Sequence, residues 1–515
     1  MKVALTVADF LNRAALVYGQ RTAVADEPSV AGSFGTLTYR ELEARARGMA
    51  LALDDLGVEH GERVAIVSPN SARFLTAYFG VSGYGRALVP INFRLTADEI
   101  AYVVQHSGAS VLLYDPDVVG EVDTIKVAHR FCLDGADDAA LFAPAPEGAT
   151  PRAWAADEDA TCSVNYTSGT TARPKGVQLT QRNCWLNAAT FGWHTGVSDR
   201  DVLMHTLPMF HCNGWGMPYA VTGMGGMHVV QRKIDGEEIL SRIEQHGVTL
   251  LCGAPAVVAA ILGAAESRAA EGRETPGRGT VRIVVAGAPP PSKTIERVES
   301  ELGWEFIQIY GLTETAPLLT INRAPAEWDD LDAAGRSQLL SRAGTPALGV
   351  QIDVDVDGEV LARSNHVFSG YWEQPVETAA ALEGGSFHTG DGGHLDGAYL
   401  VISDRKKDVI ITGGENVSSI EVEDCLYQHG AVAEVAVIGV PDDKWGETIK
   451  ALVVVRDGFT VTEAELIEHC RGRLAHFKAP TSVELRTALD RTATGKLQKY
   501  KLRQSYWEGR EKSVN

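Results

Sequence analysis

The sequence has 515 residues, of which 45% are hydrophobic and 22% charged, and its formal net charge is −20. A chain of this length can form at least two domains with sizeable cores, and its composition is that of a globular protein. The negative charge argues against a nucleic-acid partner, because neutralising phosphates requires clustered lysine and arginine. It does not exclude an anionic small substrate, since local residues set the field inside a cleft.

The seven cysteines are scattered and form no C-x-x-C pair. This pattern predicts reduced thiols in a cytoplasmic protein and argues against a disulfide framework or a zinc site. The N-terminal run carries Asp9 and Arg13 among apolar residues, which predicts a short amphipathic helix and not a signal peptide. Glycine and proline interrupt the uncharged stretches 206–230 and 248–265, so we expect buried strands and turns there and no transmembrane helix.

The first 400 or so residues alternate apolar, strand-like runs with helical patterns. A helix over 38–57 should begin with a capping box formed by Thr38 and Glu41. The strand-like runs are 63–70, 87–92, 110–115, 248–255 and 281–291. This alternation predicts an α/β domain with largely parallel, layered sheets. Near residue 350 the pattern changes to strict alternation around an Asp-Gly turn, which predicts an antiparallel hairpin.

The charged strip "SDRKKD" (403–408) separates two apolar strands and marks the predicted domain boundary, with domains at 1–404 and 405–515. The second unit is long enough for a small α+β domain. It should contain a helix near 419–429, strands at 432–441 and 449–456, and a helix near 461–475. Residues 265–280 are the one candidate for a disordered segment.

Residues 165–176, "NYTSGTTARPKG", follow a predicted strand at 161–167. Small residues let backbone N–H groups approach an oxyanion, the hydroxyls add donors, and Lys175 adds a point charge. The stretch is not a Walker loop, because Pro174 precedes the lysine and Gly176 follows it. On these residues alone, a phosphate-binding loop and a plain surface turn stay equal alternatives.

Three later motifs carry further polar residues. "QIYGLTET" (308–315) contains Glu314, which is either a metal ligand or a residue at a helix N-terminus. "FHTGDGGHLDGAYLVISDRKKD" (387–408) contains Asp391, a natural acceptor for a ribose diol, and Arg405, whose guanidinium suits hydroxyls or phosphate. "DRTATGKLQKYKLR" (490–503) contains Lys496 after a Thr-Gly turn, which alone would be a solvated charge.

The four motifs, in this order, resemble those of the adenylate-forming superfamily, which includes acyl-CoA synthetases, firefly luciferase and the adenylation domains of peptide synthetases. The resemblance covers essentially the whole chain and includes the connecting stretch "GEVLARSNHVFSGYW" (358–372). Within the superfamily, "PMFHCNGW" (208–215) and "ITGGENVSSIEVE" (411–423) look most similar to fatty-acid-type acyl-CoA ligases.

The resemblance implies a large N-terminal AMP-binding domain with a small β-barrel-like part and a small mobile C-terminal α+β domain. It also implies two half-reactions that use ATP, Mg²⁺ and coenzyme A. A carboxylate first attacks the α-phosphorus of ATP and gives acyl-AMP and pyrophosphate; a thiol, usually that of coenzyme A, then displaces AMP. The expected substrate is a hydrophobic carboxylic acid, such as a medium- or long-chain fatty acid.

The resemblance also implies roles for individual residues. The β- and γ-phosphates would be held by Thr167, Ser168, Gly169, Thr170, Thr171 and Lys175. The nucleotide would further contact Gly287, Ala288, Pro289, Tyr310 and Gly311, with Tyr310 and the 287–289 turn flanking the adenine. Asp391 and Arg405 would bind the ribose hydroxyls. Thr313 would contact the α-phosphate, Glu314 would bind Mg²⁺, and the catalytic Lys496 would reach the acid carboxylate and the α-phosphate.

For the second half-reaction, the resemblance implies a hinge at Lys407 and a coenzyme A loop at Gly413, Gly414 and Glu415. His211, Asn213 and Trp215 would line or gate the acyl pocket, and His211 is also a catalytic candidate; a buried packing histidine is the alternative for it. A roomy channel is expected from the nearby glycines, which are Gly214, Gly216, Gly223, Gly225 and Gly226. Ala172 stands where relatives commonly have glycine, which would strain the turn if φ must be positive.

Two other functions compete with a CoA ligase. One is a synthetase that passes the same adenylate to an amine, nitrite or carrier-protein thiol, or that uses an aryl acid. The other is a nucleotide-binding protein without catalysis. A homodimer is the one oligomeric state that we consider for this chain.

Overall fold

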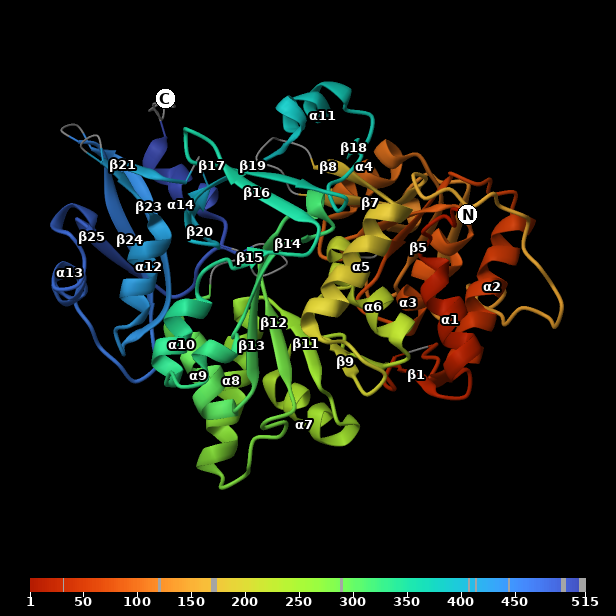
Figure 1. Cartoon of the computed structure of the whole chain (residues 1–515), viewed down its shortest axis with the longest axis horizontal. Helices are drawn as coiled ribbons and strands as arrows, with labels where there is room; N and C mark the ends of the chain where they lie inside the picture. Colours follow the sequence, from red (N-terminus) through yellow and green to blue (C-terminus); the bar gives the residue numbers. More distant parts are fainter. Residues whose placement is uncertain are drawn as a thin grey trace.

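The computed structural model describes residues 1–30, 32–118, 122–167, 174–287, 290–405, 408–412, 415–442, 445–491 and 497–508. Figure 1 shows two large sheets with their helices, a small antiparallel sheet in the centre, and a C-terminal unit beside it. The expected α/β class with a small C-terminal domain is confirmed. The boundary between residues 404 and 405 stays a prediction.

One large sheet has seven strands in the order β18-β8-β7-β4-β3-β5-β6. Neighbours from β7 to β6 run parallel, whereas β8 and β18 are antiparallel to their neighbours. The strands are β3 (Arg63–Val67), β4 (Ala87–Ile91), β5 (Ala109–Tyr114), β6 (His129–Cys132), β7 (Thr161–Thr167), β8 (Lys175–Thr180) and β18 (Gly370–Tyr371). The strands expected over 63–70, 87–92, 110–115 and 161–167 are therefore confirmed.

The second large sheet has nine strands in the order β15-β14-β13-β12-β11-β9-β10-β1-β2. It is parallel from β13 to β1 and antiparallel at both edges. The strands are β1 (Thr22–Ala25), β2 (Thr36–Thr38), β9 (Val202–His205), β10 (Met227–Val230), β11 (Leu250–Gly253), β12 (Arg282–Val285), β13 (Glu305–Gly311), β14 (Leu318–Arg323) and β15 (Thr345–Pro346).

Helices lie between and outside the two sheets. They are α1 (Ala8–Tyr18), α2 (Tyr39–Asp55), α3 (Ala72–Gly80), α4 (Ala97–Ser107), α5 (Gln181–Thr195), α6 (Met217–Met224), α7 (Gly236–His246), α8 (Pro255–Ala270), α9 (Ser292–Arg297), α10 (Ala333–Leu340) and α11 (Pro375–Ala381). The capping box of Thr38 and Glu41 at the start of α2 is confirmed, as is the N-terminal helix.

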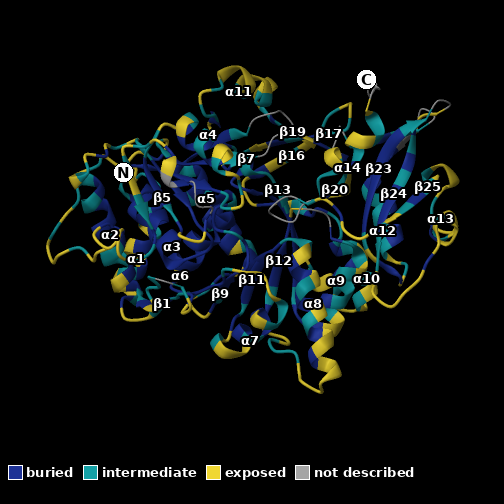
Figure 2. Cartoon of the chain, turned by 180° about the vertical axis from the view of Figure 1, so that it is seen from behind, coloured by how far each residue is buried: buried dark blue, intermediate teal, exposed yellow. Residues whose placement is uncertain are grey.

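Successive side chains of a strand point into two different hydrophobic cores, which explains why the strands are apolar on both faces. In β3, Val64 and Ile66 face the core shared with α2, α3, α5 and α6, whereas Ala65 and Val67 face the core under α4. In the second sheet, Leu251 packs against α7 and α8 while Leu250 joins the central core. The order is therefore helix, sheet, helices, sheet, helices, and the buried residues gather in the sheets and the central helices (Figure 2).

The two uncharged stretches of the sequence fold as expected. Residues 206–230 contain α6 and β10, and residues 248–265 contain β11 and most of α8. Among the described residues, none of the helices has the length and hydropathy needed to cross a membrane. All seven cysteines are free thiols. The suggested disordered segment at 265–280 is wrong in its first part, because α8 continues to Ala270.

The antiparallel hairpin expected near residue 350 is confirmed. It belongs to a four-stranded sheet in the order β16-β17-β19-β20, whose strands are β16 (Val350–Val354), β17 (Glu359–Ser364), β19 (Phe387–Asp396) and β20 (Tyr399–Arg405). This sheet stands where a small barrel-like part was expected. A bridge between Gly344 and Leu400 joins it to the end of the nine-stranded sheet.

The C-terminal unit has a five-stranded sheet covered on both faces. Its strands are β21 (Ile410–Thr412), β22 (Glu415–Val417), β23 (Val432–Asp442), β24 (Gly446–Val455) and β25 (Ser482–Arg486), and its helices are α12 (Ser419–Tyr427), α13 (Glu463–Arg471) and α14 (Lys499–Trp507). In β23, Val435 and Val437 pack under α12 and α13, whereas Ala436 and Ile438 pack against α14. The predicted helices and strands of this unit are confirmed.

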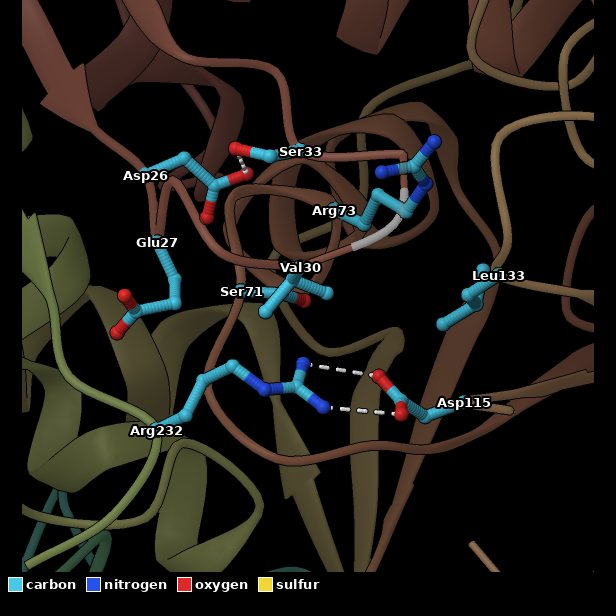
Figure 3. A pocket seen from close by; sticks show the side chains of 9 residues that line it. All are labelled: Asp26, Glu27, Val30, Ser33, Ser71, Arg73, Asp115, Leu133 and Arg232. Atoms are coloured by element: carbon cyan, nitrogen blue, oxygen red, sulfur yellow. Dashed lines mark hydrogen bonds and ion pairs between the residues drawn. The ribbon is translucent and has the colours of Figure 1, made fainter. Parts of the chain in front are cut away.

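A small pocket lies where the two large sheets meet (Figure 3). Arg232, which follows β10, donates two hydrogen bonds of 2.9 Å to Asp115, which follows β5. Both side chains are buried. The cavity measures about 10 Å³, roughly the room that one water molecule needs. This bidentate ion pair therefore ties one sheet to the other and leaves no space for an organic substrate.

Candidate active site

The two ends of the predicted phosphate loop lie next to each other. β7 and β8 form an antiparallel pair in which Thr167 stands opposite Lys175. The four predicted phosphate-binding residues between them, and the unusual alanine, lie outside the described residues; they are Ser168, Gly169, Thr170, Thr171 and Ala172. The predicted loop therefore leaves and rejoins the seven-stranded sheet on two neighbouring strands.

Helix α4 fixes both ends of this loop. The Tyr102 hydroxyl donates to the Pro174 carbonyl at 3.4 Å. His106 Nδ1 and the Tyr166 hydroxyl are hydrogen-bonded at 2.8 Å. One helix thus holds the residue before Thr167 and the residue before Lys175, so the entry and the exit of the loop are both anchored.

Tyr310 and Gly311 end β13, and Thr313 and Glu314 follow in a short 3₁₀ turn. Gly311 is required by space, because a Cβ there would stand 1.6 Å from the Pro317 carbonyl oxygen. The Glu314 carbonyl accepts a 2.7 Å hydrogen bond from the backbone N–H of Phe368. The turn that carries the predicted metal ligand is therefore fixed by a segment more than fifty residues away in sequence.

Tyr371 joins the loop lysine to the carboxylate of this turn. Its hydroxyl donates to Glu314 Oε1 at 2.9 Å, and Lys175 Nζ lies 4.7 Å from the centre of its ring. Burial, and next the charge of Glu314, raise the pKa of Tyr371 above its ordinary value, so the hydroxyl stays protonated and donates. No role was assigned to Tyr371 from the sequence. The residue lies in "SGYW", at the end of the stretch 358–372 that contributed to the resemblance, and this position was the only sign in the sequence that it belongs to the site.

The predicted ribose residues are also adjacent. The Tyr310 hydroxyl donates a 2.9 Å hydrogen bond to Asp391 Oδ2, and Asp391 is 6% exposed. On the β19–β20 ladder, Asp391 stands opposite Arg405, whose side chain lies outside the described residues. Gly287 follows β12 with φ +95°, and its predicted neighbours Ala288 and Pro289 lie outside the described residues as well.

The predicted acyl-pocket residues lie on an unusual turn after β9. Five consecutive residues, 212–216, have φ between 44° and 77° and form one turn of left-handed helix. Three of them are not glycine: Cys212, Asn213 and Trp215. Left-handed backbone costs a residue with a Cβ roughly 1–2 kcal/mol, so this turn persists only because its surroundings hold it.

Buried polar contacts hold the left-handed turn. Asn213 Nδ2 donates to Ser163 Oγ at 2.8 Å, and Asn213 Oδ1 accepts from Asn165 Nδ2 at 3.2 Å. The Trp215 carbonyl accepts from Asn187 at 3.1 Å. The Cys212 thiol lies 3.8 Å from the Thr313 carbonyl. The turn next to His211 therefore contacts both β7, which leads into the phosphate loop, and the turn of Thr313 and Glu314.

The expectation that glycines near this turn open a roomy channel is wrong. A Cβ at any of them would meet protein atoms at 3.0 Å or less: Gly214 meets Pro218, Gly216 meets Asn187, Gly223 meets Phe10, Gly225 meets Tyr18, and Gly226 meets the Asp201 carbonyl. Their missing side chains are replaced by neighbouring residues, so these glycines permit close packing and create no space.

The residues predicted for the second half-reaction are only partly described. Glu415 begins β22 and pairs with Thr412 in a hairpin of the C-terminal sheet. Lys407, Gly413, Gly414 and Lys496 lie outside the described residues. Their predicted roles as hinge, coenzyme A loop and catalytic lysine therefore stay predictions.

The described residues contain no group of three or more His, Cys, Asp and Glu side chains that could hold a metal. Mg²⁺ is usually bound by proteins through one or two carboxylates together with substrate phosphates. Glu314 supplies one carboxylate beside the cation of Lys175. One carboxylate beside a cation matches the donors that a protein usually offers to Mg²⁺ bound to substrate phosphates.

Comparison with known proteins agrees with this arrangement. A family model described as "AMP-binding enzyme" matches residues 11–372, and one described as "AMP-binding enzyme C-terminal domain" matches residues 421–496. The chain belongs to the AMP-binding enzyme family. Among the members of this family, the 2-methylpropanoate–CoA ligase CCL4 of Humulus lupulus is 36% identical, over 97% of this chain and 94% of that protein.

Another relative, the probable acyl-activating enzyme 5 of Arabidopsis thaliana, is named as peroxisomal and is 36% identical over 97% of this chain and 95% of that protein. The solved anthranilate CoA ligase AuaEII, in complex with anthranoyl-AMP, has a TM-score of 0.86 at 26% identity and covers 98% of both chains. The amide bond synthetase McbA of Marinactinospora thermotolerans has a TM-score of 0.84 at 27% identity, over 97% of this chain and 99% of that one.

The resemblance to the adenylate-forming superfamily is thus confirmed, and with it the prediction of an AMP-forming acid–thiol ligase, since relatives of this AMP-binding enzyme are CoA ligases and acyl-activating enzymes. The fatty-acid substrate, the Mg²⁺ requirement, the homodimer and the cytoplasmic location stay predictions.

Proposed function

We propose that this AMP-binding enzyme activates a hydrophobic carboxylic acid as its acyl-AMP and then transfers the acyl group to coenzyme A. The observation that carries the proposal is the contact of Lys175 and Glu314 with one side chain, that of Tyr371: the ammonium lies over its ring and the carboxylate accepts from its hydroxyl. In this arrangement the ammonium can hold phosphate oxygens, and the carboxylate can hold the Mg²⁺ of a metal–triphosphate complex. The neighbouring pair of Tyr310 and Asp391 offers a ring face and a ribose acceptor.

In the first half-reaction, a carboxylate oxygen of the acid forms a bond to the α-phosphorus of ATP. The bond from that phosphorus to the bridging oxygen breaks, and pyrophosphate leaves with the electron pair. The reaction joins two anions, so cations must neutralise the charge that builds up. Lys175 would hold the leaving phosphates, Glu314 would hold Mg²⁺, and Lys496 would bring the carboxylate to the α-phosphate. Mg²⁺ would supply charge neutralisation and orientation of the phosphates.

In the second half-reaction, the coenzyme A thiol loses its proton to solvent and its sulfur forms a bond to the acyl carbon; the bond from that carbon to the phosphate oxygen breaks, and AMP leaves with the electron pair. We propose that the C-terminal domain rotates about Lys407 between the two steps and brings Gly413, Gly414 and Glu415 to the pantetheine. Such a rotation concentrates backbone change at one or two residues, and the charged strip 403–408 between β20 and β21 is suitably placed.

For the acid, the close packing at the five glycines removes the argument from sequence for a channel that would take a long chain. A relative named for 2-methylpropanoate and a neighbour bound to anthranoyl-AMP support a compact acyl group. We therefore propose a short branched or aryl acid ahead of the medium- or long-chain fatty acid that the sequence suggested. One methylene is worth about 1–3 kcal/mol of discrimination, so a series of acids should separate the alternatives.

A second candidate is a synthetase that passes the adenylate to an amine, because the amide bond synthetase McbA is as similar in structure as the CoA ligase. Both candidates release pyrophosphate with the correct acid, but only a CoA ligase forms a thioester. The experiment is to measure pyrophosphate release for a panel of short, branched, aryl and long-chain acids, with and without coenzyme A, and to assay thioester directly. Acid-dependent pyrophosphate release without thioester would exclude the CoA ligase and leave the second candidate.

A further inference from the structure

The stretch of residues 364–372 runs between the two halves of the candidate phosphate site. Its strand β18 pairs with β8, the strand that begins at Lys175; Tyr371 stands opposite Val177 and Gly370 opposite Gln178. The Trp372 N–H donates to the Gly176 carbonyl at 2.7 Å. The backbone of this segment is therefore fixed directly to the strand that carries the lysine.

The same segment is fixed to the turn of Glu314. The Phe368 N–H donates to the Glu314 carbonyl at 2.7 Å. The Phe368 ring packs edge-on against the Tyr371 ring, with 4.8 Å between their centres. One short segment thus holds the backbone of Glu314 at one end and the strand of Lys175 at the other.

The Tyr371 side chain completes this connection between the two charged groups. Its hydroxyl meets the carboxylate of Glu314 at 2.9 Å, and its ring meets the ammonium of Lys175 at 4.7 Å. A hydrogen bond to an ionised carboxylate is stronger than one between neutral groups, and an ammonium over an aromatic face is attracted by the ring quadrupole. The aromatic ring therefore orients both charges through separate parts of one rigid side chain.

We propose that Tyr371 is a positioning residue of the triphosphate site, which holds Glu314 and Lys175 at the separation that a Mg²⁺–triphosphate complex needs. The inference rests on the proposed function, and it concerns the pyrophosphate end of the nucleotide. AMP lacks the β- and γ-phosphates, so its binding should depend on Tyr310 and Asp391 and should not depend on Tyr371.

The test separates the two parts of the side chain. Tyr371→Phe keeps the ring under Lys175 and removes the hydroxyl, whereas Tyr371→Leu removes both contacts. Calorimetry would measure binding of an ATP analogue with a methylene bridge between its α- and β-phosphorus, at several Mg²⁺ concentrations and without an acid. Binding of AMP without Mg²⁺ would be measured on the same samples. Tyr399→Phe, on β20 and stacked on Trp328, is a control for loss of a tyrosine hydroxyl.

For Tyr371→Phe we expect the dissociation constant of the Mg²⁺–analogue complex to rise about 10- to 150-fold, as for a lost hydrogen bond to a charged group, and half-maximal binding to need more Mg²⁺. Tyr371→Leu should lose a further factor of about 3, as for a lost cation–π contact. Both variants should bind AMP as the unmodified enzyme does. Unchanged analogue binding by Tyr371→Phe, or an equal loss of AMP binding, would overturn the inference. If the unmodified enzyme binds the analogue but releases no pyrophosphate with any acid, the proposed function fails and the inference does not.

Discussion

The carboxylate of Asp404 accepts hydrogen bonds from the backbone N–H of Ser419, at 3.0 Å, and from its hydroxyl. Asp404 lies near the end of β20 and Ser419 is the first residue of α12, so this contact spans the segment that contains the predicted hinge. The Ser419 hydroxyl also accepts from Lys499 at the start of α14, and Lys499 pairs with Glu423 at 2.8 Å. A chain of buried polar groups thus connects the strip before the hinge to the helix that follows the predicted catalytic lysine.

The first prediction concerns this contact across the predicted hinge. If the C-terminal unit rotates about Lys407, the contact between Asp404 and Ser419 stabilises one orientation, and hydrogen bonds to a charged group contribute about 1.5–3 kcal/mol each. Asp404→Asn should therefore change the ratio of the two half-reaction rates by about tenfold. The ratio would be measured from pyrophosphate release with the acid and from thioester formation with preformed acyl-AMP.

Asp408→Asn is the matched control. Asp408 pairs with Arg503 at 2.8 Å, and both residues follow the predicted hinge, so rotation about Lys407 should leave this pair intact. An Asp404→Asn enzyme with an unchanged ratio, or two variants that change the ratio equally, would show that the contact with Ser419 does not select an orientation.

The second prediction is a loss of stability at mildly acid pH caused by two buried histidines. His205 Nε2 and His228 Nδ1 are hydrogen-bonded at 3.0 Å, and His228 Nε2 meets Thr222 Oγ1 at 3.0 Å. Burial lowers the pKa of His205 to about 3, and burial followed by the charge of His205 lowers the pKa of His228 well below its ordinary value. Both rings are therefore neutral in the folded protein, whereas in the unfolded chain each titrates near pH 6.5.

Because the folded pKa values are depressed, their contribution to stability is complete above about pH 6.5 and is lost as the pH falls toward 3. The unfolded state binds up to two more protons, so the free energy of unfolding should fall by about 2 kcal/mol between pH 6.5 and 5.5, and by about 2.7 kcal/mol per pH unit once both histidines of the unfolded chain are protonated. Urea unfolding at pH 7.5, 6.5 and 5.5 would measure this slope. His228→Gln should roughly halve it, and the control His476→Gln, at an exposed position, should not. An equal slope in all three proteins would assign the acid sensitivity to other groups.

The third prediction measures the strain of the left-handed turn at Asn213. Asn213→Ala removes the buried hydrogen bonds to Ser163 and Asn165 and the contact with Cys184 Sγ. It keeps a Cβ in left-handed backbone, so we expect a loss of about 2–4 kcal/mol. Asn213→Gly loses the same hydrogen bonds but relieves the strain, and should be more stable than the alanine variant by about 1 kcal/mol. Urea unfolding of the two variants gives the difference directly. If the alanine variant is as stable as the glycine variant, the turn has relaxed and carries no strain.

The sequence predicted those features that depend on local pattern. The apolar runs that became β3, β4 and β5 and the capping box of Thr38 and Glu41 are short-range signals. Tyr310, expected beside the adenine, and Asp391, expected on the ribose, were predicted separately, because the hydrogen bond between them joins positions 81 apart. Tyr371 was missed for the same reason, because its partner Glu314 is 57 positions away.

Two other features, the packing at the glycines and the left-handed turn, were not predicted from the sequence, for different physical reasons. Glycine removes a side chain, but sequence does not say whether solvent, substrate or another residue takes the space; at Gly225 the Tyr18 ring takes it. Positive φ at Cys212 and Trp215 runs against the local preference of both residues. Only buried partners far along the chain, Asn187 among them, make that backbone stable. The conformational preference of a single residue takes no account of such distant contacts.

The last prediction concerns Lys496, the predicted catalytic lysine of the adenylation step. Lys496 is predicted to hold the acid carboxylate against the α-phosphate during adenylation and to be absent from the thioester step. Lys496→Ala should therefore lower acid-dependent pyrophosphate release by about 100- to 1000-fold, by analogy with the loss of a single oxyanion donor. Thioester formation from preformed acyl-AMP and coenzyme A should change by less than about threefold.

Lys501→Ala is the control, because Lys501 is an exposed lysine of the same C-terminal segment and its loss changes the overall charge equally. Equal losses in both half-reactions of Lys496→Ala would indicate damage to the C-terminal fold, since a lysine used in one step affects that step alone. Full adenylation by Lys496→Ala would remove the lysine from the mechanism. The two half-reactions must therefore be measured separately, because the rate of the overall reaction falls in the same way whichever step is lost.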